Sequence, residues 1–170
     1  MTQELNYVIF DTAAGWLGVL GSTRGVRSIT LPQPSPQEAR QQLGDGADRA
    51  TWKFEPFESL AVRFRLYFDG HKVTFPDELD LSPGTAFQRQ VWEVTRRIPY
   101  RETRSYAWVA AQIGKPQAVR AVGQALGKNP LVIIIPCHRV LKSDGTLGGF
   151  GGGLEMKRYL LSLEASARVR

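Results

Sequence analysis

Residues 105–130 read "SYAWVAAQIGKPQAVRAVGQALGKNP" and predict two short helices joined by a tight turn. Ser105 can cap the first helix, and Gly114 fits the position immediately after it. Pro116 fits the start of a second helix that ends at Gly127. This arrangement matches the helix-turn-helix pattern, whose second helix is usually presented to DNA. The same pattern also occurs in helical bundles that bind no nucleic acid.

The charge distribution along the chain bears on which of these two interpretations holds. The total formal charge is +6. Residues 1–82 carry 8 Lys/Arg and 11 Asp/Glu, a net charge of −3, whereas residues 83–170 carry 14 and 5, a net charge of +9. A basic half joined to a mildly acidic half indicates that the carboxy-terminal part meets a polyanion. The alternative is a basic surface that only aids solubility.

Changes in composition predict two domains and a linker. The expected early elements are strands at 6–12, 15–22, 25–32 and 71–75 and helices at 35–44 and 56–70. The acidic, proline-bearing stretch "PDELDLSPG", residues 76–84, is the predicted linker, and the charge balance reverses there. We therefore expect an α/β domain at 1–75 and a mainly helical domain at 85–170, which begins with a helix over 85–98.

Composition disfavours several classes of protein. With 42% hydrophobic and 22% charged residues, the chain has the composition of an ordinary soluble globular protein. The amino terminus lacks the basic and apolar regions of a signal peptide, and no apolar run approaches the roughly 20 residues of a membrane span. Because a single cysteine forms no internal disulfide, we expect a cytoplasmic protein with no membrane partner.

A metal site is also disfavoured. The only Cys and His residues are Cys137, His71 and His138, and they show no recognised ligand spacing. We therefore expect neither a metal nor another cofactor.

The cysteine lies in "IIIPCHRVL", residues 133–141, and is open to three interpretations: a buried apolar residue, a metal ligand or a nucleophile. A thiol needs a base or a positive environment to react at neutral pH, and His138 is the nearest candidate. In an extended chain, Cys137 and His138 would point to opposite faces. Contact between them therefore requires a turn, which Pro136 favours, or a bridging water.

Two later segments provide possible partners for this pair. Glu164, in the helical stretch "LEMKRYLLSLEAS", could orient His138, or it could lie on a solvated helix face. The stretch "GTLGGFGGG", residues 145–153, is either a flexible linker or a backbone that approaches a ligand closely. No Lys-Ser or Lys-Thr follows it, so a nucleotide-binding P-loop is disfavoured.

Taken together, these motifs resemble those of one family. They are "PCHRV" after an aliphatic run, "NP" before it, "RAVG" upstream, "GGL…K…LL..E" downstream and "FQRQVWEVTRRIPYRETRSYAWVA" at the start. This ordered set resembles the O6-alkylguanine-DNA alkyltransferases, also called methylated-DNA–protein-cysteine methyltransferases. The resemblance covers residues 85–164.

The resemblance implies a fold and a reaction. The expected fold is α/β plus α: a small ribonuclease H-like amino-terminal domain with a β-meander, and a mainly helical carboxy-terminal domain with a helix-turn-helix. Cys137 would take the alkyl group from O6 of guanine once, without being regenerated. His138 would accept the thiol proton through a water, and Glu164 would orient His138. Asn129 would brace the active-site turn, and Tyr106 would donate a proton or hydrogen bond to the departing guanine.

The implied partner is double-stranded DNA that contains O6-alkylguanine, bound through the minor groove with the damaged base flipped out. Arg120 would fill the space that the base leaves. The DNA-binding residues implied are Arg120, Tyr106, Ala121 and Gly123, and the pocket residues are Val140, Gly151, Phe150 and Pro136. Some members have serine where this chain has Gly151, which predicts tolerance of alkyl groups larger than methyl. We expect a monomer in solution, with cooperative assembly along DNA as an open alternative.

Three other functions remain as alternatives. An alkyltransferase-like protein would bind the lesion without reacting, but those relatives have another residue at the position of Cys137. A helix-turn-helix transcription regulator would need a dimerisation segment or effector domain, and no obvious one is present. A cysteine hydrolase would leave the basic half unexplained.

Overall fold

The chain divides into two structural units in the computed structural model, which describes residues 4–167. The first unit contains the chain up to Leu81 together with Pro130–Val132, and the second contains Ser82–Asn129 and Ile133–Ala167. The structure assigns residues 130–132 to the first unit, whereas the sequence analysis placed them in the helical domain at 85–170. They pack with the first unit because the amide of Ile29 donates to the carbonyl of Pro130.

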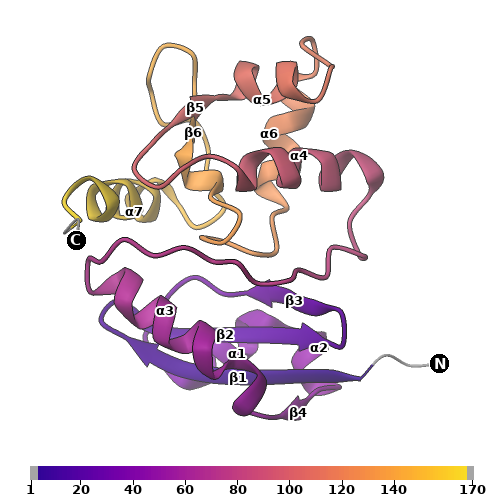
Figure 1. The fold of residues 1–170 in the computed structure, drawn as a ribbon, viewed down its shortest axis with the longest axis vertical. Coiled ribbons are helices and arrows are strands. Elements are labelled where there is room, and N and C mark those ends of the chain that lie inside the picture. The colour runs from indigo at the N-terminus through magenta and orange to yellow at the C-terminus, as the bar shows by residue number, and fades with distance from the viewer. Residues whose placement is uncertain (1–3, 168–170) are drawn as a thin grey trace. The chain divides into compact units, whose positions relative to one another are not determined.

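A four-stranded sheet of order β3-β2-β1-β4 forms the centre of the first unit (Figure 1). The predicted antiparallel meander is present, formed by β1 (Leu5–Thr12), β2 (Gly15–Ser22) and β3 (Gly25–Ile29). The short strand β4 (Thr51–Trp52) lies parallel to β1 at the opposite edge.

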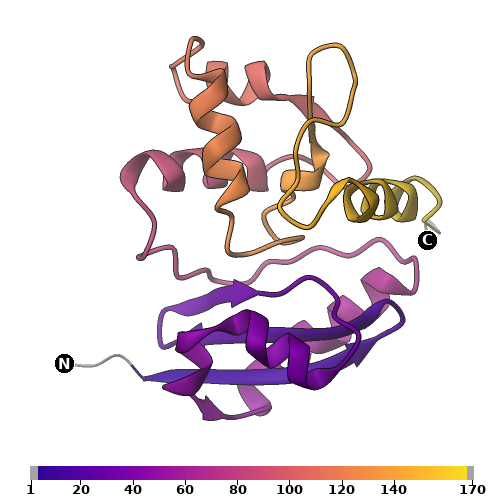
Figure 2. The ribbon, with the colours of Figure 1, turned by 180° about the vertical axis from the view of Figure 1, so that it is seen from behind.

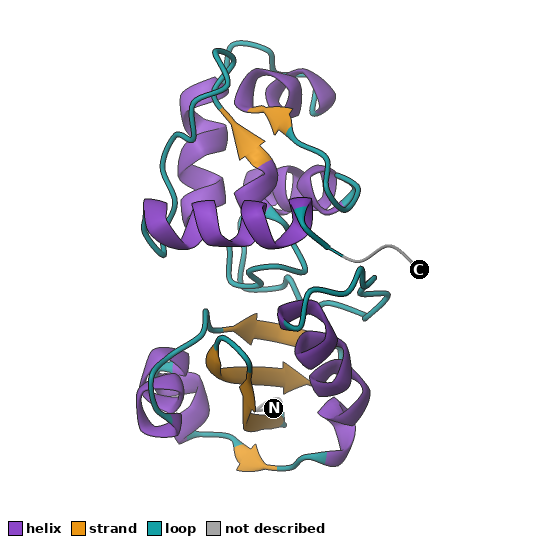
Figure 3. Ribbon diagram, turned by 90° about the vertical axis from the view of Figure 1, so that its left-hand side faces the viewer, coloured by secondary structure: helices purple, strands orange, loops and turns teal. Residues whose placement is uncertain are grey.

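Helices cover both faces of this sheet (Figure 3). They are α1 (Pro36–Leu43), α2 (Asp45–Asp48) and α3 (Glu58–Phe68), which follows the 3-10 turn η1 (Glu55–Phe57). Successive strand residues point to opposite faces. Phe10 therefore packs on Phe64 of α3, with ring centroids 6.2 Å apart. On the other face, a Cβ added to Gly18 would lie 2.9 Å from Leu43 of α1, so glycine permits the close approach.

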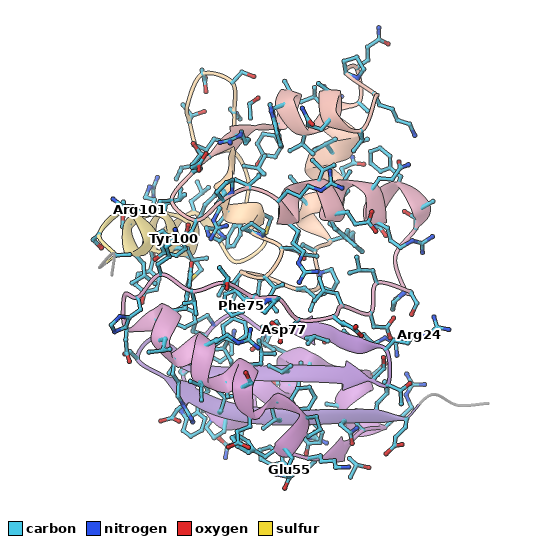
Figure 4. All side chains as sticks on the ribbon, viewed as in Figure 1. Arg24, Glu55, Phe75, Asp77, Tyr100 and Arg101 are labelled. Carbon is cyan, nitrogen blue, oxygen red and sulfur yellow. The ribbon has the colours of Figure 1, made fainter. Side chains whose placement is uncertain are left out.

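The prediction of a strand at 71–75 is wrong, because residues 72–75 form no strand. Burial alternates along this segment as it would in a half-buried strand. Phe75 packs against α3 instead: the centroid of its ring lies 4.8 Å from that of Phe64 and 6.3 Å from that of Tyr67. Figure 4 labels Phe75 on this segment. An alternating pattern thus marks half-burial here without strand pairing.

The second unit is mainly helical (Figures 1 and 2). Its elements are α4 (Ala86–Arg96), β5 (Arg104–Ser105), α5 (Tyr106–Gln112), α6 (Val119–Gly127), the 3-10 turn η2 (Cys137–Arg139), β6 (Val140–Leu141) and α7 (Leu154–Ala165). The predicted capping box at the start of α4 is present between Thr85 and Gln88. The indole of Trp92 donates to the carbonyl of Ala125, 2.8 Å away, and so links α4 to α6.

The two helices predicted within 105–130 are both present. Ser105 caps α5 by accepting a hydrogen bond from the amide of Trp108, and Gly114 follows the helix with a φ of +74°. The second helix begins later than predicted, at Val119 rather than at Pro116. Residues 115–118 form a turn in which the amide of Ala118 donates to the carbonyl of Lys115, so Pro116 lies in this turn. Within residues 4–167, no helix is both long and apolar enough to cross a membrane.

Candidate active site

Cys137 is the first residue of the 3-10 turn η2. Pro136, with φ −79° and ψ 65°, reverses the chain, so the amide of Cys137 donates to the carbonyl of Ile135 at 2.7 Å. The amide of Arg139 then donates to the carbonyl of Pro136 at 2.9 Å. These bonds confirm the turn predicted at Pro136–Cys137. Successive residues of a 3-10 helix are rotated by about 120°, so Cys137 and His138 point in different directions.

The His138 imidazole is directed towards α7, as predicted. Its Nε2 lies 2.6 Å from Oε2 of Glu164, and the side chains are 0% and 2% exposed. The other ring nitrogen, Nδ1, is buried and has no hydrogen-bond partner within the part of the chain that the structure describes. A carboxylate on Nε2 favours the tautomer that carries its proton there, which leaves the Nδ1 lone pair able to accept a proton.

Arg139 also holds the Glu164 carboxylate. Its Nε donates to Oε1 at 2.8 Å and its Nη2 to Oε2 at 3.1 Å, while Nη1 donates to the carbonyl of Ile98 at 2.7 Å. The amide of Arg101 adds a bond of 3.4 Å to Oε1. Figure 4 shows Tyr100 and Arg101 beside α7, and the Arg139 guanidinium lies 5.6 Å from the centroid of the Tyr100 ring. The carboxylate is therefore held in one position.

These contacts set the protonation states of the pair. Burial raises the pKa of Glu164, but the hydrogen bonds and charges of His138 and Arg139 outweigh it and lower that pKa to about 2. Burial lowers the pKa of His138, and the Glu164 carboxylate only partly offsets this. At neutral pH the pair therefore consists of a carboxylate and a neutral imidazole, which is the form of histidine that acts as a base.

Asn129 braces the turn next to the cysteine. Its Nδ2 donates both to the carbonyl of Ile135, at 2.8 Å, and to Sγ of Cys137, at 3.2 Å. Burial raises the pKa of the Cys137 thiol, while the bond from Asn129 and the positive charge of Lys157 oppose that rise. The sulfur is thus desolvated but faces groups that favour its thiolate form.

A pocket of about 460 Å³ opens onto Cys137. It lies among α5, α6, the active-site turn and the glycine-rich loop. Its lining residues are Tyr106, Val119, Arg120, Gly123, Gln124, Leu126, Gly127, Cys137, Lys142, Gly148, Gly149, Phe150 and Gly151. The lining is mostly apolar and includes two cationic residues, Arg120 and Lys142, and the phenol of Tyr106, which suits a flat heteroaromatic ligand. Within residues 4–167, no three His, Cys, Asp or Glu side chains gather to hold a metal ion.

Comparison with known proteins agrees with this geometry. Residues 86–166 match the family model of the 6-O-methylguanine DNA methyltransferase, DNA binding domain. A methylated-DNA–protein-cysteine methyltransferase of Mycobacterium tuberculosis is 50% identical over 164 residues, which cover 95% of this chain and 93% of the relative. The chain belongs to the methylated-DNA–protein-cysteine methyltransferase family. The Haemophilus influenzae methyltransferase of the same name is 39% identical over 94% of this chain and 86% of its own length.

Solved structures of methyltransferases have the same fold. The crystal structure of Mycobacterium tuberculosis OGT in complex with DNA has a TM-score of 0.80 and 40% identity, and it covers 96% of both chains. An O6-methylguanine-DNA methyltransferase of the archaeon Pyrococcus kodakaraensis reaches a TM-score of 0.71 at 23% identity over 94% of this chain and 98% of its own, which shows the fold alone.

In this methyltransferase, most of the site residues predicted from the sequence lie together. Those that line the pocket are Tyr106, Arg120, Gly123, Cys137, Phe150 and Gly151. Asn129 contacts Sγ of Cys137, and Glu164 contacts His138, the residue that follows Cys137. Three others lie elsewhere. Pro136 and Val140 are buried and are not lining residues, and Ala121 is exposed beside a separate hollow near Thr85.

Two charged residues of the methyltransferase site have no role in the predictions from sequence. Arg139 is buried against Glu164, and Lys157 is completely buried on α7. Burial lowers the pKa of Lys157 to about 8, although the nearby Cys137 thiolate opposes this. Two signals for Lys157 were present: it is the lysine of the motif "GGL…K…LL..E", and it lies seven residues before Glu164, so two helical turns place both on one face of α7. A lysine on such a face is usually solvated, and that pattern alone does not predict its burial.

We expect the methyltransferase to lose stability in acid. The pKa of Glu164 is about 2 in the folded state and ordinarily 4.5, so its contribution is complete above 4.5 and is lost as pH falls towards 2. Because burial also lowers the pKa of His138, the unfolded chain binds its proton at higher pH than the folded one. Both effects reduce the free energy of unfolding on acidification, by about 3 kcal/mol for Glu164.

Urea unfolding between about pH 7 and pH 3 measures this loss. In Glu164→Gln the protein is less stable at pH 7, but its stability falls less steeply with pH. An equally steep fall in the variant would contradict the assignment of the acid sensitivity to Glu164.

Proposed function

We propose that this chain repairs DNA by direct reversal, through stoichiometric transfer of the alkyl group of O6-alkylguanine to Cys137. The observation that carries this proposal is that Cys137 lines a pocket of about 460 Å³ and is followed in the chain by His138, whose imidazole forms a buried pair with the Glu164 carboxylate. Its activity is that of a methylated-DNA–[protein]-cysteine S-methyltransferase, with a single turnover per molecule. The membership of the chain in this family supports the same conclusion.

The proposed reaction is a displacement at the alkyl carbon. Sγ of Cys137 forms a bond to that carbon, and the bond from the carbon to O6 breaks with its electron pair moving onto the guanine. His138 takes the thiol proton at Nδ1 through one bridging water, and Glu164 holds the imidazole in the required tautomer. Tyr106 donates a hydrogen bond to the guanine as negative charge develops. Tyr106 then gives its proton to the guanine anion and recovers one from solvent, while His138 releases to solvent the proton that it took. The products are therefore intact guanine and a thioether that nothing in this scheme reverses.

We propose that α5 and α6 form a helix-turn-helix that enters the minor groove of double-stranded DNA. Arg120 is exposed on α6 and lines the pocket, so it is placed to fill the space left by a flipped base. On the same helix, Ala121 has only a methyl side chain and Gly123 has none, which permits close approach to the DNA backbone. This readout is independent of sequence, as damage search requires, because the minor groove carries a degenerate pattern of donors and acceptors.

The domain organisation is part of the same proposal. We infer a ribonuclease H-like domain at 1–75, a linker at 76–84 and a DNA-binding and alkyl-transfer domain at 85–170 that acts as a monomer. The sheet with helices on both faces supports the first assignment. At Gly151, an added Cβ would have only the carbonyl of Gly127 within 4 Å, at 3.8 Å. This open wall supports acceptance of alkyl groups larger than methyl.

Mass measurement of the cysteine peptide tests the proposed function. We expect that incubation with a duplex containing O6-methylguanine, followed by digestion, adds one methyl group to the peptide bearing Cys137. An undamaged duplex and the Cys137→Ser variant should give no addition. Tight binding of the damaged duplex without a change in mass would contradict the proposal and favour a lesion-binding protein. Modification of a different residue would also overturn it.

A further inference from the structure

A second hollow, of about 520 Å³, adjoins the active-site pocket, and alkyl transfer as proposed above does not use it. We call it the loop hollow, because most of its lining comes from the loop between β6 and α7. The hollow and the active-site pocket share Lys142, Gly148 and Gly149 as lining residues. The other residues that line the loop hollow are Gly145, Thr146, Leu147, Leu154 and Arg158.

The loop hollow carries two positive charges. Lys142 comes from the start of the loop and Arg158 from the second turn of α7, and both are exposed. None of the described residues that line the hollow is acidic. Within residues 4–167, neither cationic side chain forms a hydrogen bond or an ion pair. Two exposed cations that border one hollow without a protein partner favour the binding of an anion there.

The acidic residue of this loop, Asp144, is bonded to its own turn. Its Oδ1 accepts hydrogen bonds from the amide of Thr146, at 3.0 Å, and from the Thr146 hydroxyl, at 2.7 Å. The pKa of Asp144 is lowered mainly by these bonds and to a smaller extent by the charge of Lys142. The amide of Lys142 closes the turn by donating to the carbonyl of Thr146 at 2.9 Å. The ammonium group of Lys142 therefore remains available to a ligand.

The loop hollow also has apolar side chains in its lining. Leu147 is half-buried, and Leu154, the first residue of α7, is 43% exposed. An anion with an apolar body suits this combination better than a small inorganic ion does. A nucleotide unit of DNA has both parts, because its deoxyribose is joined to an anionic phosphodiester. Since Lys142 lines both cavities, a group bound in the loop hollow is next to the group bound in the active-site pocket.

We propose that the loop hollow binds one sugar–phosphate unit of the damaged DNA strand, beside the flipped nucleotide, with Lys142 and Arg158 on the same phosphate. This inference rests on the proposed function and deepens it by adding a DNA contact outside the helix-turn-helix. Extrusion of a base requires its backbone to be held in a new position. Phosphate contacts fix position without reading sequence, which suits a protein that meets lesions in any sequence.

Binding of a duplex containing O6-methylguanine, in a Cys137→Ser background, tests the two cations. In the Lys142→Gln/Arg158→Gln double variant we expect the Kd to rise roughly 10-fold, the scale of one hydrogen bond to a charged group. The slope of log K against log[salt] should become shallower by about 0.9, the contribution of one phosphate. An unchanged slope overturns the inference.

Matched variants separate this contact from net charge. The Lys142→Arg/Arg158→Lys variant keeps both charges, so its salt slope should equal that of the protein with both cations intact. Lys53→Gln removes one exposed cation from the first unit and should leave the Kd and the slope unchanged. If Lys53→Gln made the slope as shallow as the double variant does, the effect would be one of total charge, and the inference would be wrong.

Neutral phosphate replacements locate the contact. Methylphosphonates are placed one at a time at the phosphates within a few nucleotides of the lesion. At one position on the damaged strand, the replacement should weaken binding roughly 10-fold when both cations are present but have little effect in the double variant, whose partner for that phosphate is already absent.

A folding defect in the double variant would weaken its binding to every duplex by the same factor, so the replacements and the substitutions would be additive. Additivity at every position on the damaged strand therefore overturns the inference. If one position shows the coupling but the unmodified protein transfers no methyl group, the phosphate contact is supported and the proposed function is contradicted.

Discussion

Replacing Glu164 by glutamine should slow alkyl transfer roughly 100- to 1,000-fold, the range that a positioned acid or base contributes. The substitution retains the size of the side chain but removes the negative charge 2.6 Å from Nε2 of His138. Without that charge, the tautomer that leaves Nδ1 able to accept a proton is less favoured, and the imidazolium formed by proton uptake is no longer stabilised. The rate constant of single-turnover methyl transfer measures the effect.

The matched control for this prediction is Glu155→Gln. Glu155 lies in the first turn of the same helix and is exposed, so its substitution should leave the rate constant unchanged. The Kd for damaged duplex should be the same in both variants, because neither residue lines the pocket. A Glu164→Gln protein that reacts at the normal rate would show that His138 does not need its carboxylate, and the proposed proton path would be wrong.

Replacing Arg120 by alanine should slow transfer from duplex DNA roughly 100-fold, while reaction with free O6-benzylguanine stays unchanged. Extrusion of a base from the stack costs a few kcal/mol, and a side chain that fills the vacated space offsets part of that cost. A free base needs no extrusion, so it does not depend on Arg120. The ratio of the two second-order rate constants measures the contribution of the arginine to base flipping.

The control for the loss of positive charge alone is Lys115→Ala, which removes a cation from the turn before α6. This variant should weaken duplex binding modestly and in a salt-dependent way, without a change in the ratio of the two rate constants. An equal loss with both substrates in Arg120→Ala would place the arginine in the chemical step or in folding, and would contradict its role in base flipping.

Local signals in the sequence predicted many of the elements. The Thr85–Gln88 capping box and the Ser105 N-cap are present, because such caps depend on residues three positions apart and on little else. The alternation over 71–75 misled the prediction, because contact with α3 produces the same pattern of burial as strand pairing. Pro116 fits the first position of a helix, but the helix begins at Val119 because a turn comes first.

The candidate site was partly predictable for a different reason. The turn at Pro136 and the direction of His138 follow from the motif around the cysteine and from its resemblance to a known family. Lys157 was not predictable from periodicity, because its burial depends on carbonyl groups of Val140 and Gly149. Backbone carbonyls carry no signature in the sequence, so a buried lysine that they solvate looks like any other lysine on a helix.

The 3-10 turn at Cys137–Arg139 makes the length of this segment as important as its composition. Neighbouring side chains in such a turn differ in direction by about a third of a rotation. Deleting one residue before Cys137 would therefore turn the imidazole to the direction that the sulfur now takes, and inserting one would turn the sulfur to the direction that the imidazole now takes. A conservative substitution at the buried Val140 can be absorbed by small shifts in packing, but a change in spacing cannot. In this protein, the position of a residue along the turn decides whether its side chain faces the ligand as nucleophile or faces the carboxylate as base.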